Sequence, residues 1–220
     1  MLRIILQTKG NKNEEVMNLL KKNVFQICFL IILLFFSCNP KEVNKEPIIP
    51  LTITVQPFGN LDNNVTNYVY YHIKQVYPNV KLNKNIPLPH QAFFKPRNRY
   101  KADSLLQFLS ENVTNSEVII GLTNNDISIK KDKIDDYGIM GLAKKPGNVC
   151  VASSFRLKQK KLKEQFFKIA IHEIGHTQGL KHCSIKYCFM RSAEGKNPTD
   201  DEKEFCSKCK TVLTKRGFLL

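Results

Sequence analysis

Apolar and polar residues alternate along the chain in a way that predicts strands and helices from residue 51 onward. Residues 51–55 are rich in β-branched side chains and alternate in polarity, which is typical of a strand. Between residues 61 and 76, apolar side chains recur every three or four residues, which predicts an amphipathic helix ending before Pro78. A short strand at residues 80–82 and a second helix at residues 100–109 follow.

The second half of the pattern predicts a buried sheet and a long helix. Residues 117–122 are almost continuously apolar, as expected of a strand covered on both faces. Residues 138–143 and 148–152 predict two strands joined as a hairpin, and residues 158–178 predict the third helix. We therefore expect an α/β (α+β) fold with helices packed on one mixed, twisted sheet. A chain of 220 residues suffices for one such domain, placed at residues 50–220.

An apolar run near the N-terminus is typical of an export signal. Lys21 and Lys22 precede residues 24–36, an apolar run of 13 residues that ends just before Ser37 and Cys38. A membrane-spanning helix needs roughly 20 apolar residues, so this run is too short to be one. A basic segment, a short apolar core and a break at a cysteine together resemble a bacterial lipoprotein signal.

The signal divides the N-terminal part of the chain into three pieces. We expect residues 1–37 to be the signal, with residues 1–16 left untranslated if Met17 is the true start. Cys38 would then be lipidated, and residues 38–49 would link it to the domain. The protein would be exported and tethered to the membrane of the bacterial cell envelope. The alternatives are a cleaved signal in which Cys38 has no role, and a short uncleaved anchor.

The composition adds a strongly basic charge. The chain has 34 Lys and Arg against 19 Asp and Glu, a net charge of +15. Such an excess favours anionic lipid headgroups or nucleic acid as partners. The lysines are spread along the chain, however, and no nucleic-acid motif accompanies them. We therefore favour a lysine-rich solvated surface with no nucleic-acid partner, and we expect a monomer.

The candidate chemistry lies at the end of the third predicted helix. His172 and His176 are four residues apart, so both project from one side of a helix and can bind one zinc ion. Gly179 can adopt the left-handed conformation that ends a helix and turns the chain, which would bring back His182 as the third ligand. Glu173 would be the general base that takes a proton from the zinc-bound water. Three unrelated histidines would give no reason for this spacing, which is the metzincin motif HExxHxxGxxH.

A cysteine cluster begins directly after the third histidine. Two close pairs separated by a loop are the usual ligands of a structural zinc ion, and here they are Cys183, Cys188, Cys206 and Cys209. In an oxidising compartment, disulfides within each pair would compete with zinc, although bound zinc protects thiolates. Between the pairs lies Met190, which in this context suggests a Met-turn beneath the catalytic metal.

Together, these motifs resemble the archaemetzincin family of zinc metallopeptidases over roughly residues 50–210. The run HExGHxxGLxHC, followed by CxM and CxxC, carries the resemblance. It implies a metzincin-like domain that binds two Zn²⁺ ions, one catalytic and one structural, and that cleaves peptides or proteins, as an endopeptidase or an aminopeptidase. In metzincins, an extended substrate pairs with an edge strand above the zinc. The resemblance assigns that role to residues 137–143, which end in Gly141, Leu142 and Ala143.

Two other functions compete with the peptidase. The first is a catalytically weak protein that keeps the fold and its zinc sites and only binds peptides or has a structural role. The presence of Glu173 favours the enzyme, because an inactive relative often lacks the base. The second is a redox protein using Cys206 and Cys209, which their matching partners Cys183 and Cys188 make less attractive.

Overall fold

The computed structural model describes most of the chain after residue 50, namely residues 51–111, 113–114, 116–145, 147–193 and 195–220. The signal and linker expected at residues 1–49, including Cys38, lie outside the described residues. Within the described part, no helix has the length and apolar character needed to cross a membrane. The structure described below is therefore that of the predicted domain.

A five-stranded sheet forms the centre of the domain, with strand order β2-β1-β5-β9-β8. Four of its strands run parallel, and β8 pairs antiparallel with β9 at one edge, which confirms the predicted hairpin. The bounds are β1 Thr52–Pro57, β2 Val80–Leu82, β5 Glu117–Thr123, β8 Gly141–Ala143 and β9 Val149–Ser153.

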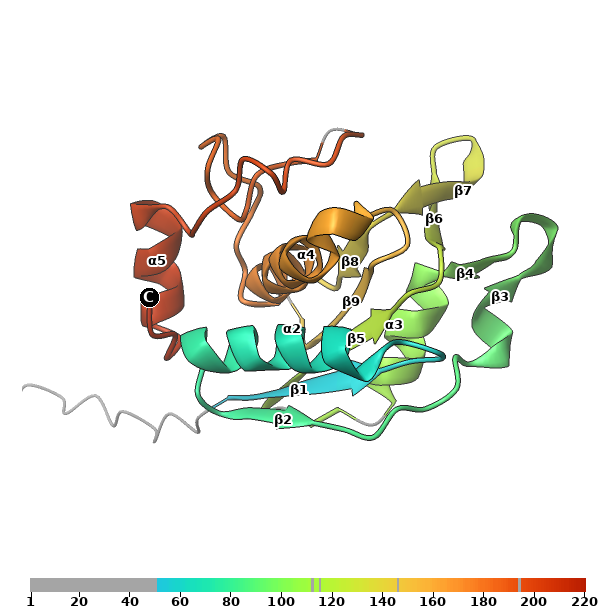
Figure 1. The fold of residues 1–220 in the computed structure, drawn as a ribbon, viewed down its shortest axis with the longest axis horizontal. Helices are drawn as coiled ribbons and strands as arrows, with labels where there is room; N and C mark the ends of the chain where they lie inside the picture. The colour runs from blue at the N-terminus through green and yellow to red at the C-terminus, as the bar shows by residue number, and fades with distance from the viewer. Residues whose placement is uncertain (1–50, 112, 115, 146, 194) are drawn as a thin grey trace, which may run out of the picture. The chain divides into compact units, whose positions relative to one another are not determined.

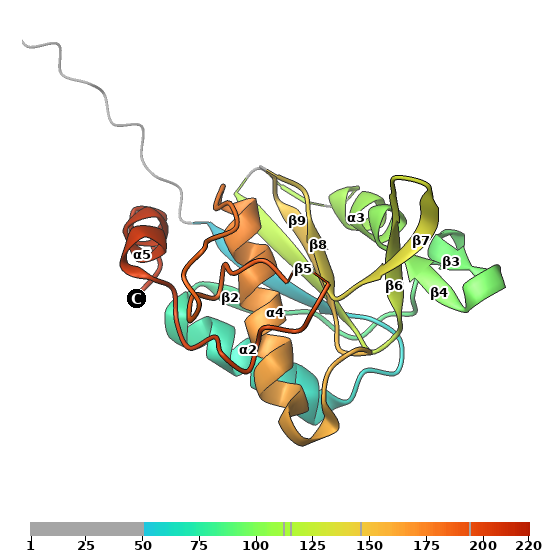
Figure 2. The same cartoon turned by 90° about the horizontal axis from the view of Figure 1, so that it is seen from above.

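Helices cover both faces of this sheet. Helices α2 (Asn63–Val76) and α4 (Leu162–Thr177) pack on one face, and α3 (Ala102–Ser110) packs on the other (Figures 1 and 2). Alternation along β9 shows the division, because Cys150 contributes to the core under α4 whereas Val151 contributes to the core under α3. A last helix, α5 (Ser207–Thr214), was not predicted.

A second, four-stranded sheet was also missed by the sequence prediction. Its order is β3-β4-β6-β7, and its strands are β3 Phe93–Phe94, β4 Arg99–Lys101, β6 Ile127–Lys131 and β7 Ile134–Ile139. The helix predicted from residue 100 begins only at Ala102, because Tyr100 and Lys101 pair with β6. The strand predicted at 138–143 is in fact the end of β7 and all of β8, which belong to different sheets.

Helix α4 differs from the predicted helix in its bounds and its environment. Residues 159–161 form a separate 3₁₀ turn, so the helix starts at Leu162 rather than at residue 158. Residues on nearly every side of α4 are buried, so the helix is covered on more than the side that faces the sheet. The segment after Met190 covers the side away from the sheet, where the Lys168 ammonium donates to the Thr199 carbonyl oxygen at 2.9 Å.

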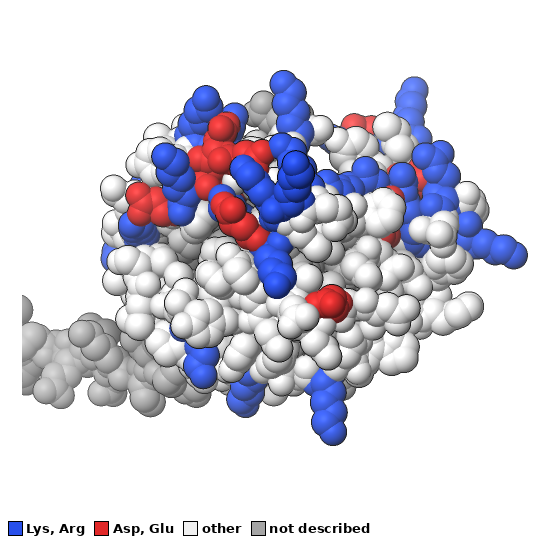
Figure 3. Space-filling model, in the orientation of Figure 1, with Lys and Arg blue, Asp and Glu red and all other residues white. Residues whose placement is uncertain are grey.

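The charged residues are interleaved rather than segregated on the face shown in Figure 3. Acidic side chains lie among the lysines and arginines over the upper part of this face, and isolated basic side chains mark the lower part. The ion pair between Lys130 and Asp135 joins two exposed side chains, and such a pair contributes little to stability.

Candidate functional site

The structure brings the three predicted histidines together at the C-terminal end of α4. The ring centroids of His172 and His176 are 4.6 Å apart, and that of His182 lies 5.4 and 4.8 Å from them. One ring nitrogen from each residue lies within 4.8 Å of the others, close enough for all three to reach one metal ion.

Gly179 makes this approach possible by ending the helix. Its φ of 89° is in the left-handed region that favours glycine, as the sequence predicts. The Gly179 N–H donates to the His176 carbonyl oxygen at 3.0 Å, and the Leu180 N–H donates to the Gly175 carbonyl oxygen at 3.1 Å. These two bonds are those of a Schellman motif, which turns the chain so that His182 faces the helix it follows.

Backbone carbonyl groups orient two of the histidines for metal binding. The His172 Nδ1 donates to the Phe189 carbonyl oxygen at 2.6 Å, and the His176 Nδ1 donates to the Leu180 carbonyl oxygen at 2.7 Å. Each ring therefore keeps Nε2 as its free acceptor. The Nε2 of His176 is buried and has no hydrogen-bond partner among the described residues, a costly arrangement unless a metal ion occupies that position.

The protonation states also fit a metal site. Burial lowers the pKa of His172 to about 4, with the nearby His182 and Lys145 adding to the effect. Burial likewise lowers the pKa of His176 to about 3, helped by His172. Both rings are therefore neutral at pH 7, the state in which imidazole binds a metal. Three nitrogen ligands with an open fourth position form a donor set suited to catalytic zinc.

Glu173 lies beside this cluster, against the edge strand β8. Its side chain is 6% exposed, and burial raises its pKa to about 8 against the opposing charge of Lys145. A Cβ atom added at Gly141 would lie only 2.5 Å from the Glu173 Oε1. The absence of a side chain at Gly141 thus makes room for the carboxyl group of Glu173.

The segment around Met190 packs against the helix that carries His172 and His176. Met190 is fully buried, and its sulfur would be 2.5 Å from a Cβ added at Gly175, so it packs directly on α4. The Cys183 N–H donates to the Met190 carbonyl oxygen at 2.7 Å, and the preceding Phe189 carbonyl holds His172. One short segment therefore contacts both the helix and the chain beside His182.

The four predicted cysteines also converge. Their sulfur atoms all lie within 4.8 Å of one another, with Cys183 and Cys206 at 3.7 Å and Cys188 and Cys209 at 3.8 Å. These separations far exceed the roughly 2.05 Å of a disulfide bond, and each cysteine is free. Cys206 caps α5 and Cys209 lies within it, so the helix that was not predicted positions the second pair.

A cleft of about 850 Å³ runs in front of the histidine cluster. Its walls include His172, Glu173 and His182, the β7–β8 strands, and the segment after Met190. Tyr137, within the predicted substrate strand, also lines it, as do Arg156 and Glu202, for which no role was predicted. No short-range spacing marks Arg156 or Glu202 as a residue of the cleft.

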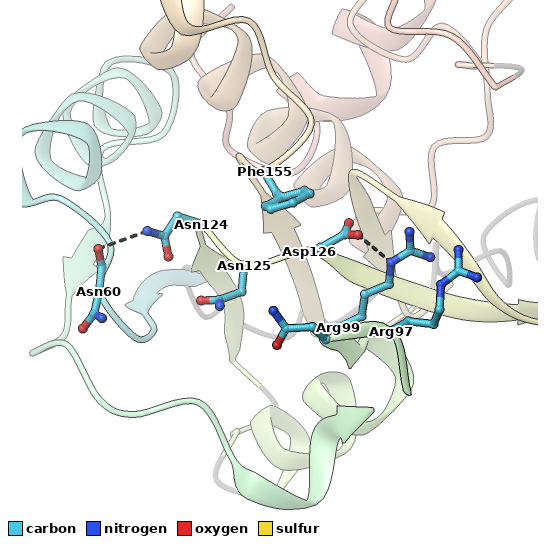
Figure 4. A pocket seen from close by; sticks show the side chains of 8 residues that line it. Asn60, Arg97, Arg99, Asn124, Asn125, Asp126 and Phe155 are labelled. Carbon is cyan, nitrogen blue, oxygen red and sulfur yellow. Dashed lines mark hydrogen bonds and ion pairs between the residues drawn. The ribbon is translucent and has the colours of Figure 1, made fainter. Parts of the chain in front are cut away.

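A separate polar pocket of about 400 Å³ lies at the carboxyl ends of β1 and β5 (Figure 4). Asn60 and Asn124 face each other across it, and Asp126 accepts from Arg99 at 2.6 Å and from Arg156 at 2.9 Å. Asp126 lies directly before β6, so its pair with Arg99 of β4 lies within the second sheet. Arg156 follows β9, so its pair with Asp126 joins the two sheets. Arg156 also lines the main cleft, so the network forms part of its wall.

The fold and the histidine cluster with its buried glutamate define a zinc-dependent metallopeptidase. The family model described as Peptidase family M54 matches residues 46–215. The chain belongs to this family. The expected activity on peptide or protein substrates and the expected dependence on zinc are therefore confirmed.

Curated relatives and solved structures agree with this assignment. The archaemetzincin of Haloquadratum walsbyi is 27% identical over 74% of this chain and 99% of its own length. That of Sulfolobus acidocaldarius is 30% identical over 70% of this chain and 91% of its own length. The crystal structure of the Methanopyrus kandleri archaemetzincin matches with a TM-score of 0.65 and 25% identity, covering 78% of this chain and 98% of that chain. The malonate complex of the Archaeoglobus fulgidus archaemetzincin gives a TM-score of 0.63, 25% identity, and coverage of 74% and 99% respectively.

Proposed function

We propose that this metallopeptidase uses Glu173 as its general base and binds catalytic zinc through His172, His176 and His182. The observation that carries the proposal is the buried Nε2 of His176, which has no hydrogen-bond partner in the described part of the chain, beside a buried carboxyl group that opens onto the cleft. When bound, zinc would polarise the scissile carbonyl group and make a water molecule more acidic.

The chain's own residues supply the proton transfers. The Glu173 carboxyl accepts the proton of the attacking water and returns it to the leaving amine nitrogen. Burial raises the pKa of Glu173 to about 8, close enough to neutral pH for the group both to take up a proton and to release it. The Phe189 and Leu180 carbonyl groups hold the histidine rings in the tautomer that leaves Nε2 free.

The substrate backbone would align along β8, through Gly141, Leu142 and Ala143. This strand lies at the edge of the five-stranded sheet and pairs on one side with β9. Its other edge offers main-chain groups to an extended peptide, as in strand addition. Gly141 would place the scissile bond near Glu173, since the two residues are in direct contact.

We also propose that a second, structural zinc ion is bound by Cys183, Cys188, Cys206 and Cys209. The converging sulfurs and the N–H group of Cys206, 3.3 Å from the Cys188 sulfur, support thiolate ligands. Because the Cys183 N–H bonds the Met190 carbonyl, this zinc would hold the turn that carries both His182 and Met190.

The test combines metal analysis with peptide cleavage, using the full chain and Glu173→Gln. Two zinc ions per chain in both proteins, with cleavage lost by on the order of 10²-fold or more in the variant, is the expected result. Peptides with free and acetylated N-termini separate aminopeptidase from endopeptidase action. Two zinc ions with no cleavage of any peptide library would instead favour the peptide-binding alternative.

Export and lipidation at Cys38 remain our proposal for the N-terminal segment. Only the residue pattern from Lys21 to Cys38 supports it, since these residues lie outside the described structure. Detergent-phase partitioning of the protein made in a bacterial host tests it. Partitioning that is the same for Cys38→Ala and the unchanged chain would refute lipidation.

A further inference from the structure

A carboxyl group outside the histidine cluster opens onto the same cleft. Glu202 lines the cleft together with Ile169, His172 and Glu173, yet its side chain is only 3% exposed. It comes from the segment after Met190, which crosses α4 in Figure 2. A buried carboxyl group requires a partner, because removing it from water is costly unless donors or a cation compensate.

The two cations that act on the charge of Glu202, Lys168 and Arg191, form hydrogen bonds with other groups. The Lys168 ammonium donates to the Glu164 carboxylate at 2.5 Å and to the Thr199 carbonyl oxygen. The Arg191 guanidinium donates to Asp201 at 2.9 Å. No hydrogen bond to the Glu202 carboxyl is found among the described residues, so its oxygens are free to accept from a molecule in the cleft.

The pKa of Glu202 also indicates a carboxyl group that lacks a partner among the described residues. Burial raises the pKa of Glu202 to about 8. The positive charges of Lys168 and Arg191 oppose this rise, whereas the negative charge of Asp201 adds to it. The protein thus leaves this carboxyl group without adequate compensation. A ligand that brings both positive charge and N–H donors would supply what is missing, and such charge-assisted hydrogen bonds are strong.

The position suits a substrate contact. Lys168 and Ile169 precede His172 and Glu173 by four residues, about 6 Å along the helix axis. Glu202 lines the cleft together with Ile169 and feels the charge of Lys168, so it lies toward the start of α4 from the histidine cluster. A peptide placed for cleavage at Glu173 would present a neighbouring group to this part of the cleft.

We propose that Glu202 determines substrate specificity, by binding a cationic amine or guanidinium group of the peptide next to the scissile bond. The inference rests on the proposed peptidase function. The cation comes from a Lys or Arg side chain or from the free N-terminal amine, and the same carboxyl chemistry recognises each.

The first test measures kcat/KM for matched peptides with the full chain. Peptides carry Lys or its uncharged analogue norleucine on each side of the cleavage site, with a free or an acetylated N-terminus. We expect the protein to prefer the cationic peptide by about ten- to a hundredfold, and Glu202→Gln to abolish that preference. If replacing the peptide's Lys by norleucine removes the preference, the cation is a side chain. If acetylating the peptide's N-terminus removes it, the cation is the terminal amine.

The matched control is Glu204→Gln, which removes the same charge two residues away. Glu204 is exposed and pairs with Lys210 on the surface, and it does not line the cleft. We expect this variant to keep the preference. A preference that survives in Glu202→Gln, or that is absent from the unchanged protein, overturns the proposal.

A binding measurement separates this inference from the peptidase proposal. Calorimetric titration with n-butylguanidinium, against 1-butanol as the uncharged probe, requires no turnover. We expect the Kd for n-butylguanidinium to rise at least tenfold in Glu202→Gln and not in Glu204→Gln. Glu202-dependent binding without cleavage of any peptide refutes the peptidase and keeps the cation site, whereas cleavage without discrimination refutes the cation site alone.

Stability measurements distinguish substrate binding by Glu202 from a purely structural role of this residue. If Glu202 only supports the fold, Glu202→Gln will lower the melting temperature and leave the ratio of kcat/KM values unchanged, which refutes the proposal. Should the Gln variant fail to fold, Glu202→Asp keeps the charge one methylene shorter. We expect it to retain a weakened preference for the cationic peptide, and an undiminished one would contradict the inferred contact.

Discussion

Substitution of Gly141 by alanine should damage catalysis without unfolding the protein. The added Cβ would lie 2.5 Å from the Glu173 Oε1, 2.7 Å from its Cγ and 2.8 Å from its Cδ. Ordinary contact begins at 3.4 Å, so the carboxyl oxygen must move by about 0.9 Å. A displacement of about 1 Å of a reacting group can cost on the order of 10²-fold in rate, or about 2.7 kcal/mol of transition-state stabilisation.

The stability of the Gly141→Ala protein should change much less. The atoms that must move, from Cγ to Oε1, belong to the one side chain of Glu173, and an unfavourable side-chain torsion costs about 0.5–1.5 kcal/mol. We therefore expect kcat/KM for a good peptide substrate to fall by about 10²-fold, with a loss of at most about 1.5 kcal/mol in the free energy of unfolding measured in urea. Zinc content should stay at the level of the unchanged chain.

The matched control is the same substitution at Gly121, in β5 of the same sheet. A Cβ there would lie 2.8 Å from the Phe58 ring and 3.1 Å from Leu109, both in the core and away from the cleft. Gly121→Ala should lower the free energy of unfolding by about 1–3 kcal/mol and leave kcat/KM of the folded protein nearly unchanged. Normal activity in Gly141→Ala would refute the inferred contact between Gly141 and Glu173.

Two further substitutions test the parts that hold the site. Cys209→Ser should lose one zinc ion per chain, as measured by mass spectrometry. Its melting temperature should fall by about 5–10 °C, because bound metal stabilises the fold. The control Cys150→Ala, in the core but outside the cysteine cluster, should keep both ions. Asp126→Asn should lower the free energy of unfolding in urea by about 2–3 kcal/mol, less than a fully buried pair would lose, because Arg156 is 35% exposed. A change below about 0.5 kcal/mol would show that the pairs of Asp126 with Arg99 and Arg156 do not stabilise the fold.

Long elements with a clear period were predictable because their signal is local. The helix over α2, the buried strand β5 and the β8–β9 hairpin follow from spacings within a few residues. The second sheet was missed because β3 and β4 are very short, and because β4, β6 and β7 carry charged residues. Its β4 comprises Arg99, Tyr100 and Lys101, which lack the alternation of a half-buried strand and depend on pairing with β6.

The burial of α4 on nearly every side was not predictable, for a related reason. A helical period shows which side chains share a face, but not what covers the opposite face. Gln165 and Lys168 look like solvent-facing residues in the sequence, yet the segment carrying Thr199 and Asp200 covers them and accepts their hydrogen bonds.

The sequence by itself determined the metal-binding chemistry of this protein. His172 and His176 must share one side of any helix they occupy, and Gly179 permits the left-handed turn toward His182. Each close pair of cysteines can supply two ligands to one metal ion. Only the tertiary structure decided what surrounds that chemistry. The contact of Gly141 with Glu173 joins a strand to a helix, and Glu202 reaches the cleft from a segment beyond Met190. Such contacts join residues that are distant in sequence and follow no period, so they exist only once the chain has packed.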